Sequence, residues 1–339
     1  QHFIHMKRQL LGVAAILLSI STYAQDNPLW MRYCAISPDG TTIAFTYKGD
    51  IYTVPSTGGR ASQITTNPAH DTKPIWSPDG KKIAFASDRM GSMDIFEVNK
   101  EGGIPKRLTT HSGNETPVAY KDAGHILFLA NIMPTAEDAQ FPSGQFQQVY
   151  EVNTEGGRPI LFSSMPMEDI SINHTGNTLL YHDKKGYEDP WRKHHTSSIT
   201  RDIWLCSLNG NRTFRKQTAF NGEDRTPVWA SDDKSFYYLS EEKGSFNIFK
   251  RDIDGNTSKQ ITNHTKHPVR FLSAASNGTL CYGYDGEIYT VKEGAIPQKV
   301  QISIVTDKND KDLIRQIKRS GATEISLSSD AKEIAFVLR

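Results

Sequence analysis

A short phrase recurs along this chain, and it limits the possible folds more than any other feature of the sequence. Ser-Pro-Asp-Gly, two polar residues and Ile-Ala-Phe occupy residues 37–45 and again residues 77–85. Degenerate copies end at Gly124, Gly176, Asp233 and Gly278, and a seventh copy runs from Ser328 to Phe336. Successive copies lie 40 to 57 residues apart. A strand-rich repeat at this interval is typical of the blades of a β-propeller.

A second motif recurs in register with the first. It is a polar–aliphatic–aromatic triplet that is followed each time by a glycine-containing turn. The six copies are Asp50-Ile51-Tyr52, Asp94-Ile95-Phe96, Gln148-Val149-Tyr150, Asp202-Ile203-Trp204, Asn247-Ile248-Phe249 and Glu287-Ile288-Tyr289. Two motifs that stay in register through six copies indicate six structural repeats.

The chemistry of the phrase predicts how one repeat folds. Pro presets φ for the first turn position, Asp can bond to the backbone two residues on, and Gly tolerates a positive φ. The turn joins a first strand to the Ile-Ala-Phe strand, the triplet starts a third strand, and the glycine turn leads to an outer fourth strand. Such a unit cannot bury both of its faces alone, so the units must stack radially.

The predicted fold is therefore all-β, a six-bladed β-propeller of four-stranded antiparallel blades over residues 26–304. First strands are expected near residues 33–37, 73–77, 117–121, 169–173, 226–230 and 270–275. Each blade is formed in order along the chain, so we expect no strand to be exchanged between the first and last blades. Phe85 and Phe96 are expected to be buried between blades.

The two ends of the sequence lie outside these six repeats. Residues 1–5 precede a natural start at Met6, and residues 6–24 combine a basic start, the apolar run Leu10–Ile20 and small residues before Gln25. This pattern predicts a removable signal peptide, export to the periplasm and no membrane span after cleavage. Residues 305–322 are expected to be a linker, and residues 323–339 the first hairpin of a second, truncated propeller.

Composition and cysteine usage exclude several classes of function. Lys and Arg total 39 against 38 Asp and Glu, and this balance argues against a nucleic-acid partner. Cys34, Cys206 and Cys281 form no C-x-x-C pair and fall on strand positions, so they are expected to be small buried residues without a metal or redox role. We find no G-x-S-x-G elbow, phosphate-binding loop or H-E-x-x-H motif, and we expect no catalytic residue, cofactor or metal site in this chain.

Two connections are longer than the repeat requires, at about residues 131–147 and 183–201, and both are expected on one face of adjacent blades. Loops on a rigid scaffold often carry function. The second loop supplies a candidate surface for a peptide or partner protein near the pore mouth: Trp191, Arg192, Lys193, His194, His195 and Arg201. The alternative is a loop that folds back on blades 4 and 5. His194 and His195 are adjacent, so their side chains diverge and make a poor chelate.

Residues 28–40, 181–187, 191–195 and 268–271 resemble the start of tricorn-type peptidases with secretion signals. Proteins of that family carry a six-bladed propeller, a seven-bladed propeller, a PDZ-like module and a serine-peptidase core. The resemblance implies that this chain is the non-catalytic first propeller of a secreted serine peptidase, a hydrolase whose catalytic Ser and His lie beyond residue 339. It would channel or filter peptides and dock the remaining domains of the same polypeptide, with association of several copies left open.

The Ser-Pro-Asp-Gly phrase is also shared with TolB-like and dipeptidyl-peptidase propellers. A second reading therefore stays open, in which the chain is a TolB-like, non-enzymatic scaffold whose loop-bearing face binds a partner protein.

Overall fold

The computed structural model describes residues 28–131, 146–187, 189, 191–192, 199–305 and 320–338. Within them, the chain divides into a unit ending at Ile304 and a second unit from Val305 onward. No helix in the described part of the chain is long and apolar enough to cross a membrane.

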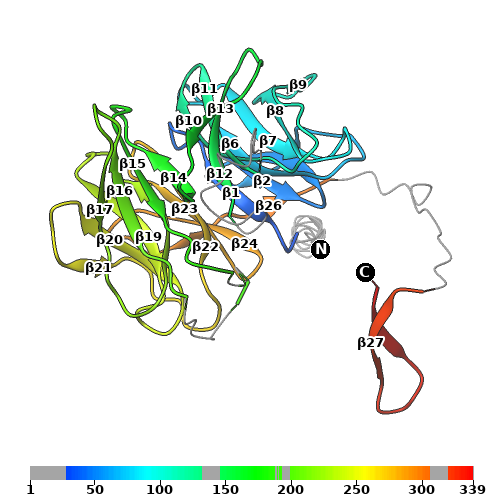
Figure 1. The fold of residues 1–339 in the computed structure, drawn as a ribbon. Helices are drawn as coiled ribbons and strands as arrows, with labels where there is room; N and C mark the ends of the chain where they lie inside the picture. The colour runs from blue at the N-terminus through cyan, green and yellow to red at the C-terminus, as the bar shows by residue number, and fades with distance from the viewer. Residues whose placement is uncertain are drawn as a thin grey trace, which may run out of the picture. The chain divides into compact units, whose positions relative to one another are not determined.

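The first unit consists of six four-stranded antiparallel sheets arranged in a ring (Figure 1). Blades 1 to 3 are β1 (Arg32–Ile36), β2 (Thr42–Tyr47), β3 (Asp50–Pro55) and β5 (Ser62–Gln63); β6 (Asp71–Trp76), β7 (Lys82–Ser87), β8 (Asp94–Asn99) and β9 (Lys106–Arg107); and β10 (Thr116–Asp122), β11 (His125–Ala130), β12 (Gln148–Asn153) and β13 (Ile160–Ser163). Blades 4 to 6 are β14 (Glu168–Ile172), β15 (Thr178–His182), β16 (Ile203–Ser207) and β17 (Thr213–Lys216); β18 (Asp224–Trp229), β19 (Ser235–Ser240), β20 (Asn247–Asp252) and β21 (Ser258–Gln260); and β22 (Arg270–Ala274), β23 (Leu280–Tyr284), β24 (Glu287–Val291) and β25 (Gln298–Lys299). The six-bladed propeller and the positions of its first strands are confirmed.

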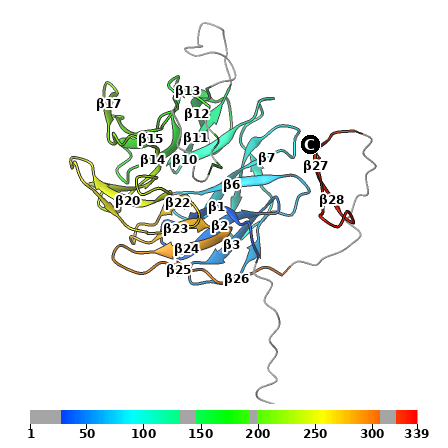
Figure 2. The same ribbon diagram turned by 90° about the horizontal axis from the view of Figure 1, so that it is seen from below.

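The ring closes through a contact that the repeat pattern did not predict. Each blade is formed in chain order as expected, but β26 (Ile302–Ser303), which follows blade 6, pairs in parallel with β4 (Gly59–Arg60) of blade 1. Figure 2 shows β26 beside the strands of blade 1. Gly58 has a φ of +92°, and a Cβ atom there would lie 2.7 Å from the carbonyl oxygen of Gln301. Only glycine permits this close approach of the two backbones.

The recurring phrase is a turn that is stabilised by its own side chains. In the first copy the Ser37 hydroxyl donates to Asp39 over 2.6 Å and accepts the backbone N–H of Thr42 over 3.0 Å. The second copy repeats both bonds at Ser77, at 2.7 and 3.0 Å. The serine and aspartate therefore satisfy groups that the tight turn leaves unpaired, which explains why both residue types recur.

The core lies between neighbouring blades. Phe85 is fully buried and Phe96 is 4% exposed, and their ring centroids are 6.1 Å apart. Both rings pack with Ala44 and Ile51 of blade 1 in one apolar cluster. This confirms the predicted strand register, because a shift by one residue would turn these side chains to the opposite face. All three cysteines are buried, as the strand positions predicted.

The second unit is a single hairpin, β27 (Ala322–Leu327) and β28 (Ile334–Leu338). Its turn repeats the side-chain bonding of the blades, since the Ser328 hydroxyl donates to Asp330 over 2.6 Å. Its first strand also carries an irregularity next to Glu324, which has a φ of 56°. The linker and the start of a second propeller stay predictions.

Candidate functional site

A bulge interrupts the first strand of every blade. In five blades it places one non-glycine residue at positive φ: Tyr33 at 51°, Lys73 at 55°, Asp169 at 49°, Thr226 at 52° and Phe271 at 58°. The register with the second strand shifts at each of these positions. A bulge leaves its extra residue unpaired and re-aims that side chain. Positive φ is uncommon outside glycine, so the repetition is a built feature of the blade.

Blade 3 is the exception, and its sequence explains why. Pro117 occupies the position that corresponds to Lys73, and the proline ring locks φ near −65°. Pro117 therefore pairs regularly with Phe128, and the register shift moves to the next residue, between Pro117 and Ala119.

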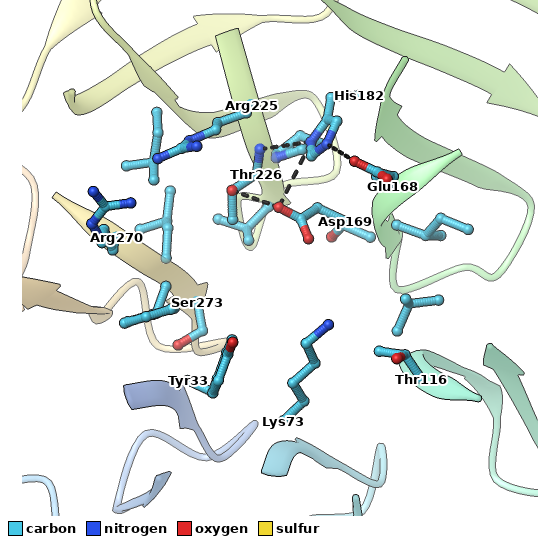
Figure 3. Close-up of a pocket in the computed structure, with 18 of the residues that line it drawn as sticks. Tyr33, Lys73, Thr116, Glu168, Asp169, His182, Arg225, Thr226, Arg270 and Ser273 are labelled. Atoms are coloured by element: carbon cyan, nitrogen blue, oxygen red, sulfur yellow. Dashed lines mark hydrogen bonds and ion pairs between the residues drawn. The ribbon is translucent and has the colours of Figure 1, made fainter. Parts of the chain in front are cut away.

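The first strands of all six blades surround one cavity of about 720 Å³. The bulge residues Tyr33, Lys73, Asp169, Thr226 and Phe271 line it, together with Val118 of blade 3. Figure 3 shows Tyr33, Lys73, Asp169 and Thr226 converging from four different blades. In five blades the bulge thus turns one side chain toward the cavity at the centre of the ring.

One wall of the cavity carries a network of charged groups from blades 4 and 5. His182 Nε2 lies 3.2 Å from Glu168, and the Lys184 ammonium donates to the same carboxylate over 2.7 Å. Burial alone would raise the pKa of Glu168, but the His182 hydrogen bond and the Lys184 charge hold it well below its usual range. The Thr226 backbone N–H donates to His182 Nδ1 over 3.3 Å, so we assign the ring proton to Nε2. Glu168 is therefore a carboxylate throughout the neutral range.

The opposite side of the cavity carries a lysine that has no such network. Lys73 points into the cavity from blade 2, with its ammonium 5.8 Å from the centroid of the Tyr33 ring (Figure 3). Within the described part of the chain, no carboxylate forms an ion pair with it. Burial lowers the pKa of Lys73, and the more distant charges of Asp169 and Glu168 oppose that shift. An amine held this way is well placed to bind an acceptor group that enters the cavity.

The mouth of the cavity is crossed by part of the blade 4 loop. Trp191 lies 6.0 Å from the Phe271 ring, and the guanidiniums of Arg32 and Arg270 lie 4.8 and 5.1 Å from the indole. Arg270 also donates to the backbone carbonyl of Trp191 over 2.8 Å. Trp191 therefore contacts residues of blades 1 and 6 and lines the cavity there.

A buried carboxylate anchors this loop on blade 5. Glu223 is fully buried, and it accepts from Arg192 over 2.8 Å and from Arg201 over 2.7 Å. Arg192 donates further to Glu241 over 2.8 Å. The carboxylates of Glu223 and Glu241 outweigh the effect of burial and raise the pKa of Arg192 above its usual range.

The predicted surface residues therefore have different environments. Trp191 is 42% exposed, whereas Arg192 and Arg201 are each 6% exposed. These two arginines position the loop and cannot contact a partner while they are buried. Lys193, His194 and His195 lie outside the described residues, as does most of the first long loop. The contacts of Arg192 and Arg201 with blade 5 are those expected of a loop that folds back on the propeller. A docking role for this segment stays a prediction.

Sequence reasoning did not identify the residues that line the cavity. The repeat showed where each first strand lies, but a bulge has no sequence signature when its residue is Tyr, Lys, Asp, Thr or Phe. Among the described residues, no group of three or more His, Cys, Asp or Glu side chains is arranged to hold a metal ion.

These features define a six-bladed β-propeller with a charged cavity at the centre of its ring. Residues 28–295 match the family model for the tricorn protease N-terminal beta propeller domain. The chain belongs to this family, which confirms the resemblance in its sequence.

Among curated relatives, Tricorn protease homolog 1 of Streptomyces coelicolor is 25% identical over 281 residues, which are 82% of this chain and 25% of that protein. The tricorn protease homolog of Saccharolobus solfataricus is 27% identical over 295 residues, 83% of this chain and 26% of that protein. The chain thus spans about a quarter of the length of these relatives.

Two solved structures share the fold. A crystal structure of the tricorn protease matches with a TM-score of 0.68 and 21% identity, covering 91% of this chain and 29% of that chain. TolB from Acinetobacter baumannii matches with a TM-score of 0.57 and 15% identity, covering 79% of this chain and 62% of that chain.

Proposed function

We propose that this chain is the non-catalytic propeller of a secreted tricorn-like serine peptidase, and that its central cavity admits peptides. Membership in the tricorn N-terminal propeller family supports the proposal that the chain is part of a tricorn-like peptidase. The observation that carries the channel role is the cavity of about 720 Å³ into which the blades direct their bulge residues. The partners of the chain are then peptides and the remaining domains of the same polypeptide, with self-association as a further expectation.

The chemistry of the cavity suits an extended peptide. Carboxylates at Glu168 and Asp169 and the ammonium of Lys73 face a space that also has the aromatic walls Tyr33 and Phe271. A peptide offers N–H donors, carbonyl acceptors and charged termini, and these groups can bind to both signs of charge. Trp191 at the mouth would favour entry of an unfolded segment over a folded protein.

The test uses the full-length protein and a matched pair of blade 2 variants. Lys73→Gln removes the cavity ammonium, and Lys81→Gln removes a lysine whose side chain is 78% exposed. We expect Lys73→Gln to change kcat/KM several-fold for peptides of about ten residues, with turnover of a dipeptide-sized substrate unchanged. Lys81→Gln should change neither. An equal effect of Lys73→Gln on both substrates, or none on either, would refute a channel role for this cavity.

Export is part of the proposal and has its own test. Residues 6–24 carry the basic and apolar segments of a signal peptide, so the exported chain should begin after Ala24. N-terminal sequencing of protein from periplasmic and cytoplasmic fractions measures this directly. Recovery of unprocessed protein from the cytoplasm alone would contradict export.

The alternative function is a TolB-like interaction scaffold, and the shared fold with TolB favours it. In that case the loop-bearing face binds a partner protein, and the cavity takes no part. Trp191→Ala would then weaken partner binding while Lys73→Gln would not, and the full-length protein would show no peptidase activity.

A further inference from the structure

The first and last blades meet along a seam that brings two cysteines together. Strand β1 of blade 1 packs against β22 and β23 of blade 6. Across this seam the backbone N–H of Ile36 donates to the Ser273 hydroxyl over 3.0 Å, and the Cys34 thiol lies 3.5 Å from the carbonyl oxygen of Phe271. In the sheet of blade 6, Ser273 pairs directly with Cys281. The two cysteines thus lie on facing strands of neighbouring blades.

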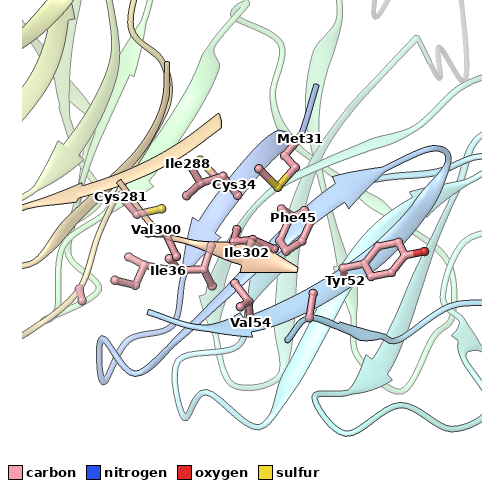
Figure 4. Close-up of a cluster of buried hydrophobic side chains, with 13 residues drawn as sticks. Met31, Cys34, Ile36, Phe45, Tyr52, Val54, Cys281, Ile288, Val300 and Ile302 are labelled. Atoms are coloured by element: carbon pink, nitrogen blue, oxygen red, sulfur yellow. The ribbon is translucent and has the colours of Figure 1, made fainter. Parts of the chain in front are cut away.

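Their side chains are buried in the same place. Cys34 and Cys281 both belong to one buried apolar cluster at the seam between blades 1 and 6, and Figure 4 shows both residues there. They are separated by 247 residues of sequence (281 − 34), so no spacing motif could have indicated the pair. Cys206, the third cysteine, packs in a different cluster with residues of blades 3 and 4.

We propose that Cys34 and Cys281 form a disulfide that closes the propeller ring covalently when a disulfide donor is present. One cysteine attacks the donor as a thiolate and forms a mixed disulfide, with release of the first donor thiol. The second cysteine, also as a thiolate, then displaces the remaining donor thiol and completes the Cys34–Cys281 bond. The two cysteines lose two electrons and two protons in total, and the donor disulfide is reduced to two thiols.

The packing determines when this exchange can happen. Cys281 is fully buried and Cys34 is 4% exposed, so a donor has no access to either sulfur in the closed ring. Burial, and then the neighbouring thiol, raise the pKa of Cys281, so little of the reactive thiolate is present there. The bond should therefore form while the chain folds or when the seam opens, and once formed it should resist reduction.

The consequence concerns the joint between the first and last blades. Each blade is internally hydrogen-bonded, whereas ring closure depends on packing, on the short β26–β4 pairing and on single hydrogen bonds such as those from Ile36 to Ser273 and from Ser276 to Pro38. A bond between Cys34 and Cys281 spans the same seam, and it would hold blades 1 and 6 together even when that pairing opens. The sequence argument against a redox role considered only local spacing, and it does not apply to a pair made by ring closure.

The test is to refold the full 339-residue chain from guanidinium in a buffer of oxidised and reduced glutathione. Free thiols are then counted in denaturant after excess reagent is removed, and peptides are mapped by mass spectrometry. We expect one free thiol per chain, at Cys206, and a linked peptide pair containing Cys34 and Cys281. The oxidised protein should melt about 10 °C above the reduced protein, because the closed loop is long.

Two variants separate this pairing from chance oxidation. Cys206→Ala should retain the linked pair and show no free thiol. Cys281→Ala should keep two free thiols and show no rise in Tm on oxidation. Three free thiols after oxidative refolding of the native chain, glutathione adducts in place of a link, or a bond that includes Cys206 would each overturn the proposal. Because Cys206→Ala leaves the seam intact, it decides the question even if Cys281→Ala fails to fold.

Discussion

Glu223 is the residue whose replacement tests the architecture of the cavity mouth most directly. Its carboxylate is fully buried, with Arg192 at 2.8 Å, Arg201 at 2.7 Å and Arg225 at 3.6 Å. Burial lowers the pKa of Arg225 to about 10, while the Glu223 charge opposes that shift. The substitution Glu223→Gln keeps the size and one acceptor oxygen but removes the negative charge from among these guanidiniums.

The expected loss follows from the geometry. Two of the three arginines contact Glu223 at hydrogen-bond distance, and all three are less than a tenth exposed. Removing one partner of a buried ion pair costs about 3–5 kcal/mol, because the remaining charge cannot regain its hydration. Glu241 still balances the charge of Arg192. We therefore expect Glu223→Gln to lower the free energy of unfolding by about 3–5 kcal/mol, the cost of one unpaired buried charge and not of three.

The assay compares the urea unfolding of the native chain and of Glu223→Gln at pH 7, monitored by far-UV circular dichroism. Glu242→Gln is the matched control, since Glu242 is exposed and, among the described residues, forms an ion pair only with the neighbouring Lys243 over 3.3 Å. An exposed pair of this kind contributes about 0–1 kcal/mol. A loss of less than about 1 kcal/mol for Glu223→Gln, or equal losses for the two variants, would refute the reasoning.

The pH dependence gives a second readout of the same interaction. Burial would raise the pKa of Glu223, but the charges of Arg201 and Arg225 outweigh it and lower the pKa. A lowered pKa in the folded state contributes stability above the unfolded value of about 4.3, and this contribution is lost as the pH falls further. The gap between the native chain and Glu223→Gln should therefore narrow below about pH 4. A gap that stays constant down to pH 3 would contradict this.

Three further predictions concern packing, titration and activity. Phe96→Ala should destabilise the propeller by about 3–5 kcal/mol in the same unfolding assay, and a loss under about 1 kcal/mol would contradict its place between blades. Burial, helped by the nearby Asp202, raises the pKa of Asp224 to about 7. The folded protein therefore holds a proton on Asp224 that stabilises it at low pH, and this contribution is lost as the pH rises to 7. Asp224→Asn should lessen the fall in Tm between pH 5 and 8. The isolated 339-residue chain should cleave no peptide, and hydrolysis that a serine-directed inhibitor abolishes would overturn the assignment of a non-catalytic propeller.

The propeller could be predicted from sequence because its information is local and repeated. The turn phrase carries its own hydrogen bonds, as at Ser37 and Asp39, so each copy indicates the same structure wherever it occurs. The apolar runs around Phe85 and Phe96 likewise indicate strands that are buried on both faces, between two neighbouring blades. Copies that have lost the serine and proline remained identifiable because a second motif stayed in register with them.

The cavity could not be predicted because it depends on long-range geometry. The side chains of Lys73 and Asp169 meet only after the ring closes, and the bulges that aim them have no consensus residue. The charge of Arg192 suggested an exposed contact, yet its partner Glu223 follows it by 31 positions and buries it. The Cys34–Cys281 pair is equally non-local.

The bulges assign two roles, packing of the blade and lining of the cavity, to different residues of the same strand. The flanking residues of each first strand supply the blade with its packing, while in five blades the bulge residue leaves the ladder and lines the cavity. Tyr33, Lys73, Asp169, Thr226 and Phe271 already show that an aromatic, a cation, an anion and a hydroxyl can occupy this position in a single molecule. The ring is therefore a scaffold with independently exchangeable positions, and a relative could acquire a new preference by substitutions there while every blade remained intact.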